Sequence, residues 1–163
     1  MARPHRPFPD STARFAKHLP TGRDVTLIVL KTHLLAEVEL NELLEVLLPH
    51  PESLYRSRFT FVQRLRIFEA ISSDPEIHLL VRAVYALNEV RNTLSHQLEA
   101  ANFKKAAAVF IHHAFYAAFD AASRKRVDKR GPTEQDFSIN SLKSASAIVI
   151  GLLARHKKNA GQA

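Results

Sequence analysis

Two residues five positions apart, Arg91 and His96, have the side-chain types best suited to chemistry in this sequence. Imidazole has an unperturbed pKa of about 6.5, so His96 can accept or release a proton near neutral pH. A guanidinium keeps its charge and presents planar donors, so Arg91 can hold an anionic group. The stretch that contains both residues therefore combines a proton-transfer group with a fixed cation.

The element that must position these residues is a helix expected to run from about Pro75 to Gln97. Its apolar residues recur in alternating steps of three and four, the spacing that keeps one helix face against a core: Ile77, Leu80, Val84, Leu87, Leu94 and Leu98. Arg91 takes the next position in that series. A guanidinium there needs a hydrogen-bond acceptor or a water-lined opening.

A second face of the same helix is expected to carry a ridge of polar side chains at helical spacing, formed by Tyr85, Glu89, Asn92 and His96. Asn92 can orient the reacting groups, and Tyr85 or Glu89 can tune the imidazole. Ser95 is a further supporting candidate.

The composition suits one compact helical domain, since the 163 residues are 46% hydrophobic and include only 4 glycines. The absence of cysteine excludes disulfides, thiolate zinc sites and cysteine nucleophiles. Gly-rich phosphate loops, GxSxG elbows and HExxH motifs are also missing. The histidines are scattered without metal-ligand spacing, so we expect neither a metal site nor a cofactor.

The chain is basic, with a net charge of +7 and a pI near 10.0, a bias that attracts polyanions such as RNA, DNA or acidic proteins. Solubility is an equally simple reason for such a surface. The densest positive patch is a linker before the Gly131-Pro132 turn signal, with the candidate nucleic-acid-binding residues Arg124, Lys125, Arg126, Lys129 and Arg130.

The sequence lacks an apolar run of the roughly 18 residues that a membrane-spanning helix requires. Its first residues also lack the apolar core of a secretory signal. We therefore expect a cytoplasmic protein with no membrane association.

Three regions are expected: a basic, Pro-rich N-terminal arm at 1–23, a helical domain at 24–158 and a short tail at 159–163. The arm is expected to be mobile, with one turn around Ser11 to His18. The domain is predicted to be an all-α, up-and-down bundle of about five helices. Its helices are expected near Val25 to Leu48 with Asp24 as N-cap, from Thr60, from Pro75 to Gln97, from Asn102 to Arg124, and from Ser141 to His156.

The second half of the first long helix carries four carboxylates, Glu37, Glu39, Glu42 and Glu45. They indicate either a surface that pairs with basic residues elsewhere in the chain or a charged face in water.

The stretch Arg91-Asn92-Thr93-Leu94-Ser95-His96 resembles the R-x4-H signature of the HEPN superfamily, including the polar residue that the family favours after the arginine. The resemblance covers roughly Asp24 to Phe119. It is nearer to the HEPN-type families related to the mannitol repressor than to the minimal toxins.

This resemblance implies a homodimer in which the motif helices of two chains meet in one cleft. It implies metal-independent RNA cleavage, in which the ribose 2′-OH attacks the adjacent phosphate. His96 would then take the hydroxyl proton and Arg91 would stabilise the phosphate as charge builds. It also implies a place in a defence, toxin or stress module with an antitoxin or regulatory protein partner.

Three alternatives remain open at this point. Arg91 could be a buried cation paired with a glutamate of the first long helix while His96 packs at the helix end. The chain could be a non-catalytic HEPN-like module that binds a protein partner or nucleotide, similar to mannitol-repressor-type proteins. It could also be a basic nucleic-acid-binding bundle that uses Arg124 to Arg130 and the arm. One subgroup has a tyrosine two positions after the histidine, where this chain has Leu98, so regulation through that tyrosine is not expected.

Overall fold

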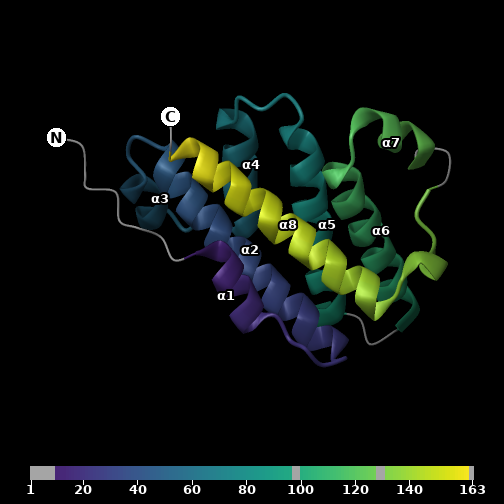
Figure 1. Ribbon diagram of the computed structural model, residues 1–163. Helices are drawn as coiled ribbons and strands as arrows, with labels where there is room; N and C mark the ends of the chain where they lie inside the picture. The colour runs from purple at the N-terminus through teal and green to yellow at the C-terminus, as the bar shows by residue number, and fades with distance from the viewer. Residues whose placement is uncertain (1–9, 97–99, 128–130, 162–163) are drawn as a thin grey trace.

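The computed structural model describes residues 10–96, 100–127 and 131–161, and all regular structure in them is helical (Figure 1). The all-α prediction is thus confirmed. The elements in order are α1 (Ser11–His18), α2 (Val25–Leu47), α3 (Glu52–Arg56), α4 (Phe61–Ile71), α5 (Ile77–His96), α6 (Ala100–Ala118), α7 (Ala121–Val127), the 3-10 helix η1 (Glu134–Asp136) and α8 (Ile139–Ala160). The number of α-helices exceeds the expected five because α1, α3 and α7 are short additional helices.

Helix α2 lies at the centre of the bundle. It begins after Asp24, whose carboxylate accepts a hydrogen bond of 3.0 Å from the backbone N–H of Leu27 and caps the helix as predicted. Its apolar residues are not confined to one stripe, because α1, α4, α5 and α8 all pack against it.

Helices α5 and α6 are antiparallel neighbours, whereas α2 and α8 run in the same direction (Figure 1). The parallel direction follows from the contacts: Lys143 at the start of α8 donates to the carbonyl of Thr21, and Ser146 accepts from Thr32 one turn later. A parallel pair needs a connection that returns along the bundle. The segment of α7 and η1 provides it, with Phe137 packing edge-to-face on Phe103 at the start of α6.

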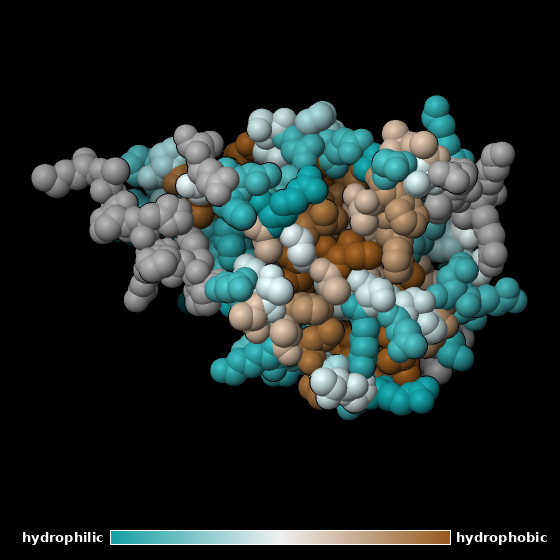
Figure 2. Space-filling model, in the orientation of Figure 1, coloured by the Kyte–Doolittle hydropathy of each residue, from teal (hydrophilic) through white to brown (hydrophobic). Residues whose placement is uncertain are grey.

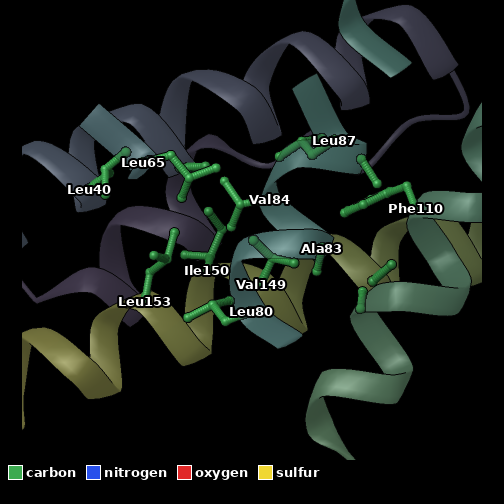
Figure 3. Close-up of a cluster of buried hydrophobic side chains, with 14 of the residues drawn as sticks. Leu40, Leu65, Leu80, Ala83, Val84, Leu87, Phe110, Val149, Ile150 and Leu153 are labelled. Carbon is green, nitrogen blue, oxygen red and sulfur yellow. The ribbon is translucent and has the colours of Figure 1, made fainter. Parts of the chain in front are cut away.

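The core is formed where α2, α4, α5, α6 and α8 meet (Figure 3). Fully buried side chains include Leu40, Leu65, Leu87, Phe110 and Leu153. Because α5 is buried along one face by this core, its other faces are held at fixed orientations.

Helix α8 (Ile139–Ala160) extends beyond the expected Ser141 to His156, and two other segments differ from expectation for identifiable reasons. The helix expected at Asn102 to Arg124 is two helices, because the carboxylate of Asp120 accepts a hydrogen bond of 2.7 Å from the N–H of Ser123 and starts α7. In the segment expected to be a mobile arm, α1 forms two helical turns and packs on α2 and α8. Residues 1–9 lie outside the described part of the chain.

On the face of the molecule seen in Figure 2, apolar residues gather toward the centre and hydrophilic residues surround them. Among the described residues, the large apolar side chains with the greatest exposure include three on one side of α2: Leu27, Leu30 and Leu34, which are 42%, 44% and 54% exposed. We call these three residues the α2 stripe. No helix in the described ranges has the length and apolar character needed to cross a bilayer.

Candidate functional site

The side chain of Arg91 is exposed, not buried in the apolar stripe of α5. The stripe instead continues through Val90, which is fully buried. Neighbouring positions on a helix differ by about 100°. A shift of the buried stripe by about one position therefore places Val90 in the core and Arg91 at the surface. The guanidinium donates to the Oδ1 atom of Asn92 at 3.2 Å. It makes no ion pair with any residue that the structure describes, so a buried pair between Arg91 and a glutamate of α2 is not present there.

Arg91 lies on the side of α5 that faces α2, next to a histidine that the sequence did not single out. The Nε2 atom of His33 donates to the Oδ1 atom of Asn88 at 3.1 Å, and its ring packs on Phe61 with centroids 4.5 Å apart. Burial lowers the pKa of His33, and the positive charge of Arg91 lowers it further, against the raising effects of Asn88 and Glu37. His33 is therefore neutral at neutral pH.

The sequence offered one signal for His33, namely a histidine within a largely apolar helix. Two of the three α2-stripe residues, Leu30 and Leu34, lie within one helical turn of His33 on α2. His33 thus lies near the α2 stripe along α2, and its hydrogen bond to Asn88 joins it to α5 about one turn before Arg91.

Helix α5 ends at His96, whose side chain lies outside the described residues. The structure therefore does not give the distance between the imidazole of His96 and the guanidinium of Arg91. The hydroxyl of Ser95 donates to the carbonyl of Arg91 at 3.0 Å, and that of Thr93 donates to the carbonyl of Glu89 at 2.8 Å. These bonds hold both hydroxyls against the helix backbone.

Of the expected ridge of Tyr85, Glu89, Asn92 and His96, the structure describes the first three side chains. Tyr85 and Glu89 line a groove between α5 and α6, together with Thr93. Asn92 instead bonds to Arg91. Around the helix Asn92 is about 60° from Glu89 and about 100° from Arg91, so its amide can reach the guanidinium while Glu89 faces the groove.

The structure describes only part of the basic segment at 124–130. Arg124 is bound to Glu76 by two hydrogen bonds of 2.5 and 3.0 Å, and its Nε donates to the carbonyl of Tyr116. The hydrogen bond from Arg124 lowers the pKa of Glu76. Lys125 is exposed. The side chain of Arg126 and residues 128–130, which include Lys129 and Arg130, lie outside the described residues.

A cluster of buried charges joins α1, α2 and α8, and we call it the Glu39 cluster (Ser11, Arg14, Glu39, Glu42 and Lys157). The Nζ atom of Lys157 lies 2.6 Å from a carboxylate oxygen of Glu39 and 2.6 Å from one of Glu42. Arg14 bridges the other oxygens of both carboxylates, at 3.1 and 2.6 Å. Ser11 donates to Glu39 at 2.8 Å.

The Glu39 cluster has a structural function. Glu39 is fully buried, and a buried carboxylate requires paired charge and hydrogen bonds. Burial by itself would raise the pKa of Glu42, but hydrogen bonds from Arg14 and Lys157 hold it below its ordinary value. Glu37 also pairs with a basic residue, Arg64, at 3.4 Å. Of the two interpretations of the four α2 carboxylates, the pairing surface is correct for these three.

No group of three potential metal ligands occurs among the side chains that the structure describes. Comparisons of the chain with protein-family models, with curated proteins and with solved structures gave no match. Functional interpretation therefore rests on the geometry and chemistry of the residues described above.

Proposed function

We propose that the protein is a metal-independent, HEPN-like endoribonuclease of a defence, toxin or stress module, with an active site that forms between two copies of the chain. The observation that carries this proposal is the state of Arg91. It is an exposed cation without an ion-pair partner among the described residues, five positions before His96 in the chain.

The need for a second copy follows from the helix. Five positions correspond to about 140° around a helix, so we expect the side chains of Arg91 and His96 of one chain to diverge. Two copies that meet through this surface can bring the Arg91 of one chain to the His96 of the other. A phosphate between them would then have a cation on one side and an imidazole on the other.

The α2 stripe supplies a reason for two copies to associate. Burial of an exposed leucine side chain contributes on the order of 1.5–3 kcal/mol when it is complete. The stripe flanks His33, which lies beside Arg91, so association through the stripe would bury the margin of the proposed site and exclude water from it.

The chemistry requires one proton acceptor and one fixed cation. His96 removes the proton of the ribose 2′-OH, and the oxygen attacks the neighbouring phosphorus. The bond to the 5′ oxygen breaks, and that oxygen takes up a proton from the imidazolium of His96 or from water, leaving a 2′,3′-cyclic phosphate and a 5′-hydroxyl end. Arg91 neutralises the additional negative charge on the phosphate oxygens in the transition state, and Asn92 orients the guanidinium through its hydrogen bond.

The test is incubation of the purified protein with total RNA in EDTA. Wild type is expected to cut, while Arg91→Ala and His96→Ala are expected to lose about 100-fold or more in rate, as typical for removal of one transition-state donor. Arg58→Ala is the matched control, because Arg58 is an exposed arginine in the connector before α4. Intact RNA with wild type, or equal cutting by both variants, contradicts the proposal.

A second candidate is a non-catalytic HEPN-like regulatory module, similar to mannitol-repressor-type proteins, in which an antitoxin or other regulatory protein covers the α2 stripe. The exposed leucines support it as well as they support a homodimer. It predicts that RNA stays intact and that the purified chain is a monomer until its partner is added.

A third candidate, a nucleic-acid-binding bundle that uses the basic segment, receives less support. Arg124, the first of its five cations, is already occupied by Glu76. Such a protein would bind RNA or DNA with a steep salt dependence and would keep that binding after loss of His96.

A further inference from the structure

A groove of about 980 Å³ lies between α5 and α6, with the residues of α4 nearest to α5 at its edge. On α5 its lining extends from His78 to Thr93, which corresponds to about 22 Å along a helix. On α6 it extends from Asn102 to His113, or about 16 Å. An elongated ligand fits this shape better than a compact one.

The floor of the groove is aliphatic and made of small or branched side chains: Val81, Ala86, Ala106 and Val109. Such a surface accepts the apolar stripe of another helix, as in recognition of an amphipathic helix by a groove. One aromatic ring, Tyr85, lies at the margin and is partly exposed. The guanidinium carbon of Arg66 is 6.0 Å from its centroid.

The walls carry two cations, Arg82 and Lys105, that no carboxylate among the described residues neutralises. Both side chains are exposed. Arg66 is different, because Glu69 binds it at 2.7 Å. His113 lies in the same groove, and the charge of Arg82 adds to burial in lowering its pKa. The unpaired cations thus come from both α5 and α6.

The charges favour a protein ligand over RNA. Glu69, which Arg66 binds, and Glu89 also line the groove, and Glu89 would repel RNA, which carries a negative charge at every nucleotide, whereas a helix can place a basic residue opposite it. A helix with several acidic residues and one basic residue can pair with both signs of charge. Since the floor is aliphatic, leucine or valine on its inner face would complete the fit.

We propose that the groove between α5 and α6 binds an acidic amphipathic helix of a partner protein. Its apolar stripe lies mainly on Ala106 and Val109, which are partly exposed, and its carboxylates meet Arg82 and Lys105. The site is separate from the surface that carries Arg91, so a partner could bind here whether or not the chain is a nuclease or a dimer.

The proposal is tested with a display library of 16-residue amphipathic helices, with flanking positions randomised among Asp, Glu, Lys, Arg and Ser. Selection against the full chain is expected to enrich Asp and Glu. The best peptide is expected to shift amide signals of α5 and α6 in an NMR titration. The double variant Arg82→Glu/Lys105→Glu is expected to bind it at least about tenfold more weakly, because like charges then face each other.

Arg58→Glu/Lys158→Glu is the matched control, since it reverses the same number of charges at exposed positions outside the groove and should bind as wild type does. Circular dichroism checks that all variants fold. A selection that yields no binder, or yields basic peptides, overturns the proposal. So does equal binding by the double variant, or a single-stranded RNA hexamer that occupies the groove more tightly than the peptide does.

Discussion

The Glu39 cluster and Arg91 differ in whether the fold pairs their charges or leaves them exposed. In the cluster, two carboxylates and two cations neutralise each other inside the protein and hold α1 against α2 and α8. At Arg91, a cation remains exposed with only a neighbouring amide as partner among the described residues. The difference teaches that charge density in the sequence does not distinguish the cations that the fold pairs internally from those that it leaves exposed.

The largest expected effect is on stability, from loss of a cation in the Glu39 cluster. Lys157→Ala removes a charge that two carboxylates share, one of them fully buried. Loss of one partner of a buried ion pair typically lowers the free energy of unfolding by about 3–5 kcal/mol. Urea denaturation of this variant and of Lys158→Ala measures the effect.

Lys158 is exposed and adjacent, so its substitution is expected to change stability by less than about 0.5 kcal/mol. Equal stability of the two variants would mean that the cluster contributes little to holding α1 in place.

The next effect concerns association through the α2 stripe. Leu30→Glu is expected to raise the dissociation constant of the dimer at least about tenfold, because an exposed leucine that is buried on association is replaced by a charge. Analytical ultracentrifugation measures it. Ile71→Glu, which alters an exposed apolar residue at the end of α4, is the control. An unchanged mass distribution for Leu30→Glu would exclude the stripe as the contact.

A smaller effect is the pH dependence of the Glu39 cluster. The pKa of Glu42 is held below its ordinary value in the folded protein, so its contribution to stability is present above about pH 4.3 and is lost as the pH falls through the folded-state pKa. The difference in unfolding free energy between wild type and Glu42→Gln is therefore expected to shrink on acidification. A difference that grows below pH 4 would reverse the assigned sign.

The smallest effect is a change in the pKa of His33 when Arg91 is removed. Burial is the main cause of its low pKa, and the charge of Arg91 adds to it, so Arg91→Ala is expected to raise the pKa of His33 slightly. NMR titration of the imidazole signals measures this. Arg82→Ala is expected to raise the pKa of His113 instead. If Arg91→Ala left His33 unchanged, the two side chains would not share one site.

Much of the fold is predictable from local signals. The capping residues Asp24 and Thr60 mark the starts of α2 and α4, and apolar spacing locates α5 to within two residues at each end. The break at Asp120 was missed because the Ala-rich sequence on both sides is equally helical. The packing of α1 was missed because it depends on ion pairs between residues more than 20 positions apart, such as Arg14 and Glu39.

The site was harder to predict than the fold. Apolar spacing placed Arg91 in the core, and a rotation of about one residue puts Val90 there instead. His33 and the groove depend on which helices become neighbours, which no local pattern specifies. An active site that forms between two chains is harder still to predict, because the sequence of one chain does not show which surfaces meet.

The most direct test of the central claim is a complementation assay. Arg91→Ala and His96→Ala chains, each inactive alone in EDTA, are mixed under conditions that exchange subunits, and RNA cleavage is measured. If the site combines Arg91 of one copy with His96 of the other, mixed dimers contain one intact site, and activity is expected to return to roughly a quarter of wild type by random pairing. A mixture that forms mixed dimers yet stays as inactive as its components would contradict a shared site.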